Sequence, residues 1–169
     1  KNTKKKLQTA LNTFQKGFSA LNEAYDAAID RIERQQSGDR ESARAVLSWI
    51  IYAERQLTAR ELCHALAVEP GDKELDPDNI PDIEDLVSVC AGLVTFDYDS
   101  DNVRLVHYTT QEYFERIRQR WIPKAQEDIT SICLTYLCFD TFKSGDCAGY
   151  IDFRTRLRIN PLLHYAARY

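Results

Sequence analysis

Two short apolar segments joined by an acidic turn interrupt an otherwise helical sequence. Leu93-Val94-Thr95-Phe96 and Val103-Arg104-Leu105-Val106 are rich in β-branched residues, and residues 97–102 between them are mostly polar. Two such segments around a polar turn predict a β-hairpin. Gly92 directly precedes the first segment and predicts the end of the helix before it.

Three expected helices precede this hairpin, over residues 40–53, 58–68 and 81–90, and a fourth follows it over 109–120. Thr58 with Glu61, and Thr109 with Glu112, have the spacing of capping boxes at the starts of two of them. Pro81 suits the first turn of the third helix, where its missing amide costs nothing. Three short helices followed by a hairpin is the winged-helix arrangement, with Pro81–Cys90 as the third helix and Thr95–Leu105 as the wing.

Further helical segments flank this unit. Apolar residues at helical spacing predict N-terminal helices over 3–16 and 19–35, broken near Gly17, and Ser37-Gly38-Asp39 marks the end of this arm. The apolar positions of the second of these helices are Leu21, Ala24, Tyr25, Ala28, Ile29 and Ile32. A long apolar helix is expected over 124–140, with one or two shorter helices after it. The predicted fold class is mostly α: a helical arm (1–37), a winged-helix domain (38–120) and a C-terminal helical segment leading toward further repeats (121–169).

Composition favours a soluble protein with a real core. Of the 169 residues, 44% are hydrophobic and 28% are charged, and no segment approaches the roughly 18 apolar residues that a membrane span needs. The five cysteines lack CxxC spacing, so buried thiols in a reducing cytoplasm are expected rather than disulfides. The thiols placed in apolar helical patterns are Cys63, Cys90, Cys133 and Cys138. Because the chain starts at Lys1 and contains no methionine, we expect an excerpt of a longer protein.

The charge pattern bears on DNA, the usual partner of a winged helix. From Glu69 to Asp101 there are eleven acidic residues and a single basic one, Lys73. The predicted third helix, which enters the major groove in DNA-binding winged helices, carries three acidic residues and no Lys or Arg. Non-specific DNA affinity comes mainly from Lys and Arg contacts to phosphates. This face therefore predicts no nucleic-acid partner, and DNA binding through Lys1–Lys6 or the arginines of 116–120 is the alternative.

Catalytic and metal-binding patterns are also missing from the sequence. It contains no GxxxxGK[ST] phosphate-binding loop, and Gly17-Phe18-Ser19-Ala20-Leu21 lacks the final glycine of a nucleophile elbow. Cys63 and His64 are adjacent on a helix and point in different directions. His64, His107 and His164 lack the spacing of metal ligands. We expect no enzyme activity, no metal and no cofactor within these residues.

His107 stands out by its position. It follows the second predicted strand and precedes the helix that Thr109 opens, so its ring is expected at a strand-to-helix corner. An imidazole at such a corner can be a purely structural group that holds backbone atoms.

The segment Leu105–Phe114, with sequence LVHYTTQEYF, resembles the winged-helix histidine motif of NACHT-type signalling ATPases. Residues 21–32, 46–62 and 90–94 add a wider similarity to fungal NACHT–ankyrin proteins of the STAND, NLR-like class. The same module is similar to the winged helix of the GPI inositol-deacylase type, although no deacylase motif is present. Asn160–Ala167 is similar to the ankyrin signature with one extra leucine, and is interpreted as the approach to an ankyrin array rather than its first repeat.

In the NACHT-type family the motif histidine contacts the phosphate of bound ADP and latches the winged helix onto the nucleotide domain. The resemblance gives this role to His107, in the intact protein only, with Thr109 and Glu112 capping the helix that positions it. A hydrogen bond from an imidazole to a phosphate oxygen is chemically reasonable. The resemblance also implies ADP or ATP in the parent protein, a NACHT domain and ankyrin repeats as intramolecular partners, and a role in fungal non-self recognition or programmed cell death.

Three functions are thus distinguished. The first is a non-catalytic signal-transduction module that relays nucleotide state between a NACHT domain and ankyrin repeats. The second is a nucleic-acid-binding winged helix, and the third is an accessory domain of a lipid-processing hydrolase. The excerpt alone is expected to be monomeric and to have no membrane partner.

Overall fold

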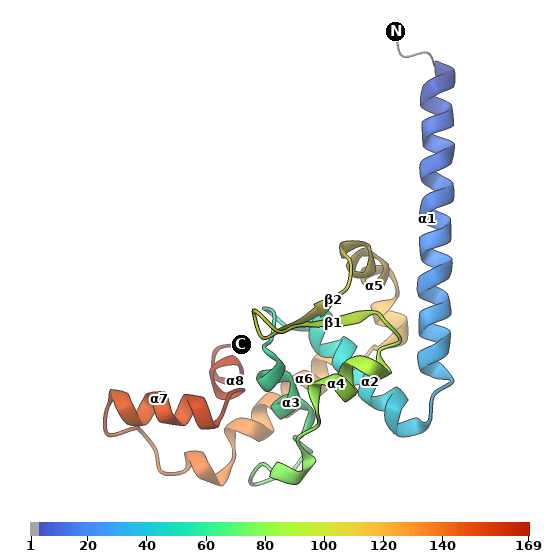
Figure 1. Ribbon diagram of the computed structural model, residues 1–169. Coiled ribbons are helices and arrows are strands. Elements are labelled where there is room, and N and C mark those ends of the chain that lie inside the picture. Colours follow the sequence, from blue (N-terminus) through green and yellow to red (C-terminus); the bar gives the residue numbers. More distant parts are fainter. Residues whose placement is uncertain (1–3) are drawn as a thin grey trace.

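The computed structural model describes the backbone of residues 4–169, Gly17, and the side chains of residues 19–169 (Figure 1). The predicted mostly α architecture with a small hairpin is confirmed. In chain order the elements are α1 (Lys4–Glu33), α2 (Ser37–Tyr52), α3 (Ala59–Leu66), the 3-10 turn η1 (Pro77–Asn79), α4 (Ile83–Val89), β1 (Val94–Asp97), β2 (Asn102–Leu105), α5 (Tyr108–Trp121), α6 (Ala125–Leu137), the 3-10 turn η2 (Asp140–Phe142), α7 (Tyr150–Ile159) and α8 (Leu163–Arg168).

The β1–β2 hairpin forms the wing. Its strands are antiparallel, in a register that places Val94 opposite Leu105 and Asp97 opposite Asn102. The free edge of β2 pairs with the segment before α3: an isolated bridge joins Thr58 to Asn102, and Val103 N donates to the carbonyl of residue 57 at 3.3 Å. This third pairing, which the sequence did not indicate, anchors the wing to the start of α3.

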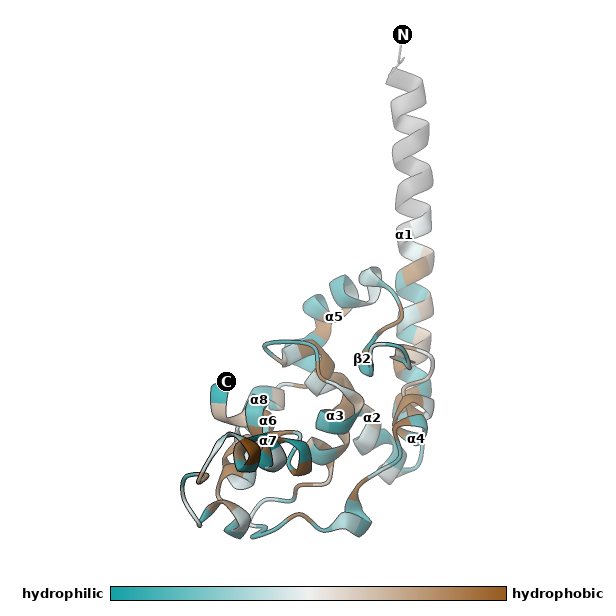
Figure 2. Cartoon of the chain, turned by 60° about the vertical axis from the view of Figure 1, so that its left-hand side comes forward, coloured by the Kyte–Doolittle hydropathy of each residue, from teal (hydrophilic) through white to brown (hydrophobic). Residues whose placement is uncertain are grey.

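The core lies around α2. This helix packs against α1, α3, α4, α5, α6 and β2, and apolar residues gather where the helices of the body meet, whereas hydrophilic stretches predominate on α5 at its edge (Figure 2). Fully buried large side chains come from most of these elements. They include Trp49, Tyr136, Phe114, Phe139, Ile32, Leu47, Leu62 and Leu162.

The N-terminal arm is one helix, so the predicted break near Gly17 is wrong. Gly17 lies inside α1, and a Cβ at this position would meet nothing within 4 Å, so the glycine marks no close approach. A lone glycine weakens a helix by about 1 kcal/mol and does not end it. The C-terminal part of α1 packs on the body, while the remainder projects away from it (Figure 1). The lysines of Lys1–Lys6 lie outside the residues whose side chains the structure describes.

Several helix ends in the structure also differ from those predicted from the sequence. Ser37-Gly38-Asp39 is not a break but the first turn of α2. In α4 the N-cap is Asp82, whose carboxylate accepts from Glu84 N at 2.7 Å, so Pro81 precedes the helix instead of opening it. The long helix expected over 124–140 ends at Leu137, and the turn η2 follows.

The cysteine prediction is correct in part. Cys63, Cys90 and Cys133 are buried free thiols, but Cys138 is exposed, as is Leu134 one helical turn before it. Cys147 is partly buried, and all five thiols are free. Among the described residues, no helix combines the length and the apolar character required to cross a bilayer.

The central position of α2 predicts a large effect of truncating its side chains. Leu47 is fully buried, so Leu47→Ala should lower the free energy of unfolding by about 2–5 kcal/mol through lost burial and an unfilled cavity. Leu134→Ala is the matched control, because Leu134 is 58% exposed and exposed substitutions usually change stability by less than about 0.5 kcal/mol. Urea denaturation followed by circular dichroism measures both. Equal effects of the two variants would contradict the assignment of the core.

Candidate functional site

His107 lies at the strand-to-helix corner that the sequence predicted. Val106 N still belongs to the hairpin end, donating to Leu93 O at 3.1 Å, and His107 is extended with φ −147° and ψ 148°. It is the N-cap of α5, and its Nδ1 accepts a hydrogen bond from Thr109 N at 3.3 Å. The imidazole therefore satisfies one of the amides that the start of a helix leaves unpaired.

Thr109 and Glu112 do not form the predicted capping box. The residue before α5 that caps the helix is His107, and Glu112 is exposed without a capping bond among the described contacts. Thr109 Oγ1 instead lies 2.8 Å from His107 Nδ1 and 2.5 Å from the hydroxyl oxygen of Tyr25 on α1. The threonine thus connects the histidine to the N-terminal arm.

The contact between α1 and α5 is polar and aromatic around this point. The Tyr25 and Tyr113 rings lie 5.2 Å apart, and the Tyr113 hydroxyl donates to Asp26 Oδ1 at 2.5 Å. Burial, and then the bond to Asp26, raise the pKa of Tyr113 well above its ordinary value. Arg116 also donates to Asn22 Oδ1 at 2.5 Å. Sequence reasoning placed Tyr25 in an apolar stripe, and its polar role went unseen because Thr109 is 84 residues away.

The outward side of His107 faces solvent. Its neighbour Tyr108 is 71% exposed, and the two rings lie 4.6 Å apart. Among the described side chains, none bonds Nε2 of His107. A pocket of about 260 Å³ adjoins the ring, with polar lining from Arg55, Gln56, Arg104 and Gln111. The protein thus holds one ring nitrogen, Nδ1, while the exposed ring adjoins the pocket.

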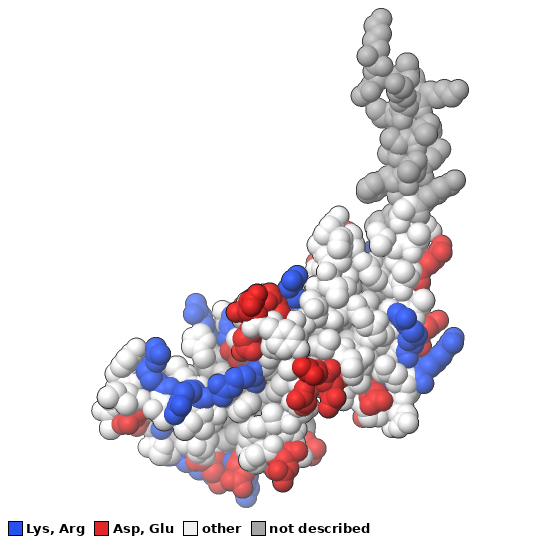
Figure 3. Space-filling view, in the orientation of Figure 1, with Lys and Arg blue, Asp and Glu red and all other residues white. Residues whose placement is uncertain are grey.

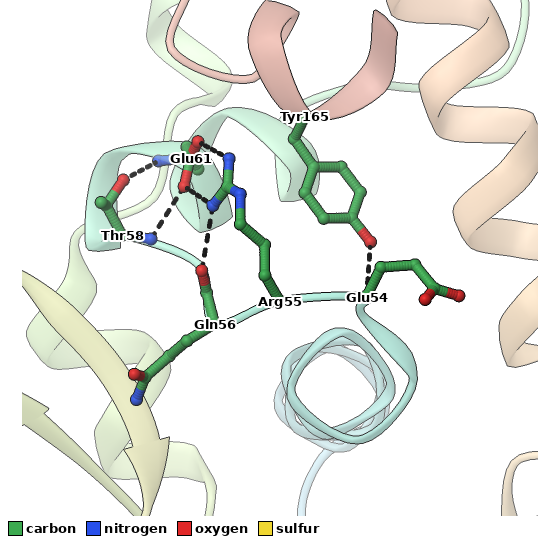
Figure 4. Close-up of polar contacts among 6 residues, drawn as sticks. All are labelled: Glu54, Arg55, Gln56, Thr58, Glu61 and Tyr165. Carbon is green, nitrogen blue, oxygen red and sulfur yellow. Dashed lines mark hydrogen bonds and ion pairs between the residues drawn. The ribbon is translucent and has the colours of Figure 1, made fainter. Parts of the chain in front are cut away.

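A second polar cluster forms at the start of α3 (Figure 4). The predicted capping box is confirmed: Glu61 N donates to Thr58 Oγ1 at 3.2 Å, and Thr58 N donates to Glu61 Oε2 at 2.9 Å. Arg55 adds a bidentate pair to the same carboxylate, at 2.8 and 2.6 Å. Burial alone would raise the pKa of Glu61, but the bonds from Arg55 and Thr58 outweigh it and lower the pKa below 4.5.

This cluster also reaches the C-terminal segment. Tyr165 on α8 accepts a hydrogen bond from Glu54 N at 3.1 Å through its hydroxyl, and the Arg55 guanidinium lies 5.3 Å from its ring centre. Figure 4 shows Tyr165 lying beside Arg55 and Glu54. Arg55 and His107 line the same pocket, so a residue contacted by the C-terminal segment and a residue linked to the arm lie beside one another there.

The other candidate residues do not assemble into a reactive site. Burial, with a smaller effect of Asp82, raises the pKa of Cys63 to about 11, so its thiol is not a ready nucleophile. His64 Nδ1 lies 3.3 Å from the Tyr136 hydroxyl, and burial, followed by Arg60, lowers its pKa. In the part of the chain that the structure describes, no group of three or more His, Cys, Asp or Glu side chains is placed to hold a metal ion.

Three short helices, a wing that follows them and a helix capped at the wing's end define a winged-helix domain. More than half of the chain, residues 30–118, matches the family described as GPI inositol-deacylase, winged helix domain. The chain belongs to this family, which is associated with NACHT-containing proteins. No curated protein and no solved structure matches it. The matched residues include α2 to β2, most of α5 and the last turn of α1.

The Glu61 cluster predicts a stability effect. Glu61→Ala removes half of a capping box and leaves Arg55 without its carboxylate, so the free energy of unfolding should fall by about 1–3 kcal/mol. Glu115→Ala on α5 is the control, because Glu115 is exposed and its removal should change stability by less than about 0.5 kcal/mol. Denaturant unfolding of both variants tests this, and a loss at Glu61 no larger than at Glu115 would contradict it.

The lowered pKa of Glu61 predicts a pH dependence. Its folded pKa lies below the ordinary value of 4.5, so its stabilising contribution is complete above pH 4.5 and is lost as the pH falls through the folded pKa. The stability difference between the wild type and Glu61→Gln should therefore be constant near neutral pH and shrink below pH 4.5. Unfolding curves over an acid pH series measure it. A difference that stays constant to the lowest pH would show that the ionised carboxylate contributes nothing.

Proposed function

We propose that this chain is a non-catalytic regulatory module of a NACHT-type nucleotide switch. It relays nucleotide state from a NACHT domain before it to ankyrin repeats after it. The family supports a NACHT-associated context. The observation that carries the proposal is the exposed His107 imidazole, which is held through Nδ1 at the N-cap of α5 and linked through Thr109 to Tyr25 of the arm.

The proposed contact between His107 and a nucleotide phosphate depends on which imidazole nitrogen the protein holds. With Nδ1 accepting from Thr109 N, Nε2 carries the proton and can donate to a phosphate oxygen. Hydrogen bonds to charged groups contribute about 1.5–3 kcal/mol each, which suits a contact that is made in one nucleotide state and lost in another. ADP or ATP is therefore the ligand of the nucleotide switch in this proposal, and this chain supplies one contact to it.

The architecture suits a relay because both flanking segments contact the same part of the domain. The arm reaches His107 through Thr109, and the C-terminal segment reaches Arg55 through Tyr165. A switch needs two arrangements that its ligands stabilise differently, and these two joints are where such arrangements would differ. A cytoplasmic role in fungal non-self recognition or programmed cell death is the corresponding biological proposal.

Nucleic-acid binding is the less favoured function. Helix α4 begins with the acidic residues Asp82, Glu84 and Asp85, and the wing tip carries three more aspartates. These groups would repel a phosphate backbone at the surface that usually enters the groove. The remaining alternative is an accessory role beside a lipid-processing hydrolase. A GxSxG motif in a neighbouring domain would support the hydrolase, whereas a GxxxxGK[ST] motif would support the nucleotide switch.

The latch predicts that His107 controls nucleotide retention in the longer natural protein that includes the proposed NACHT domain. His107→Ala should raise the Kd for ADP about 10–100-fold, because one charge-assisted hydrogen bond is lost. The measurement is nucleotide extracted from the purified protein, together with the release rate of a fluorescent ADP analogue. His164→Ala is the matched control, since His164 is also exposed and lies on α8. Unchanged retention in the His107 variant would make His107 a structural corner residue.

A further inference from the structure

Helix α7 differs from the other long helices because none of its residues is buried. Its large apolar side chains expose 47–79% of their surface at four positions, Tyr150, Ile151, Phe153 and Ile159. A hollow on this helix is lined by α7 residues alone, so no other element of the described chain covers it. Apolar side chains that gather on an exposed helix mark an interaction surface.

The same side of α7 is basic. Tyr150, Arg154 and Arg158 follow one another at steps of four residues and therefore share one side of the helix. The Arg154 guanidinium lies 5.9 Å from the Tyr150 ring centre, and Arg60 of α3 reaches this helix by donating to Arg158 O at 3.1 Å. Within the part of the chain whose side chains are described, no carboxylate forms an ion pair with these three arginines. Their charges are open to a partner.

The chain also carries a surface of opposite charge, at the wing tip and the start of α4. The Tyr98 hydroxyl joins its two halves by donating to Glu84 at 2.9 Å, and the Tyr98 ring is 72% exposed. An exposed tyrosine among carboxylates suits a basic partner, because a guanidinium can both pair with the carboxylates and stack on the ring. This acidic surface consists of Asp82, Glu84, Asp85, Asp97, Asp99 and Asp101.

The basic side of α7 and the acidic surface face the same way. Figure 3 shows both on one face of the molecule, with a row of basic groups over α7 and acidic groups at the wing tip and over α4. A second copy, turned by half a turn about an axis between the two surfaces, would place each basic surface over the acidic surface of the other copy. A twofold contact of this kind is closed and stops at two copies.

We propose that α7 is a self-association surface, and that in a twofold dimer its Arg154 and Arg158 side docks on the acidic surface of a second copy. The opposite charges orient the two copies, and the exposed apolar side chains of α7 lose contact with water. This inference needs no nucleotide and no neighbouring domain, so it goes beyond the proposed function and does not rest on it. It departs from the monomer expected from the sequence, since the exposure of α7 becomes visible only in the folded chain.

Sedimentation equilibrium of the 169-residue chain tests the proposal. A reversible equilibrium between monomer and dimer is expected at low salt, with no larger species. Raising the NaCl concentration from about 0.05 to about 0.5 M should weaken dimerisation about tenfold, because salt screens exposed charges. A chain that stays monomeric at low salt up to about 1 mM, or that forms a series of larger species, would overturn the proposal.

Charge reversal identifies the two surfaces. The variants Arg154→Glu/Arg158→Glu and Asp85→Lys/Asp99→Lys change exposed side chains, and each should weaken dimerisation at least about tenfold, because like charges then face each other. An equimolar mixture of the two variants should dimerise with nearly the wild-type Kd, since both contacts of the mixed dimer again join opposite charges. Failure of the mixture to recover, with both variants folded by circular dichroism, would contradict the twofold contact.

The matched control is Arg120→Glu/Lys124→Glu. It changes the net charge by the same amount at two exposed positions outside both surfaces. This variant should dimerise like the wild type. A loss as large as that of Arg154→Glu/Arg158→Glu would mean that net charge, and not the surface of α7, controls association, and the proposal would be wrong.

Discussion

The structure depends on burying α2 on nearly every side. A helix that packs against several others must be apolar around most of its circumference, and α2 buries Ala43, Val46, Leu47, Trp49 and Ile51. Its buried Ser48 is satisfied by donating to Arg44 O at 2.7 Å. The turn from α1 into α2 is fixed by Glu33, which accepts a bidentate pair from Arg44 at 2.9 Å and a bond from the Trp121 indole at 2.7 Å. The arm is therefore connected to the domain by packed and bonded residues around a short turn, and not by a loose linker.

Two polar contacts join the flanking helices to this core, Tyr25 with Thr109 and Tyr165 with Glu54. Both connect residues far apart in the chain, 84 positions between Tyr25 and Thr109 and 111 between Glu54 and Tyr165. In each, a tyrosine from a flanking helix supplies a ring for packing and a hydroxyl for one specific bond. The ring provides most of the burial, while the hydroxyl requires a defined position. Tyr165 lies in the apolar core, whereas Tyr25 is only partly buried, so separating the arm at Tyr25 would lose less apolar contact than separating the C-terminal segment at Tyr165.

The local part of this architecture could be predicted from sequence, and the long-range part could not. The hairpin and the Thr58–Glu61 capping box follow from spacing within a few residues, and both are present. Thr109 and Glu112 had the same spacing, but His107 caps α5 because the extended backbone after β2 places its ring over the first turn. Gly17 suggested a break, but the destabilisation by one glycine, about 1 kcal/mol, is small beside the stabilisation from the remaining hydrogen bonds of a 30-residue helix. The roles of Tyr25, Tyr165 and Arg55 arise only once the chain has folded, since no local pattern records a partner that far away.

The distribution of charge decides which side of the domain can approach a phosphate. The Tyr98 hydroxyl donates to Glu84 at 2.9 Å, so the acidic wing tip and the acidic start of α4 are joined into one surface. Figure 3 shows acidic groups at the wing tip and over α4, and a row of basic groups over α7. Acidic groups on this face repel anions, so the fold that this domain shares with DNA-binding proteins is not by itself evidence of nucleic-acid binding. The His107 side differs, because the adjoining pocket is lined by Arg104, two glutamines and Arg55, whose charge is paired with Glu61. For the proposed phosphate contact, the base of the wing is the side of the domain that this charge distribution leaves, and there the exposed His107 is held by the protein through Nδ1.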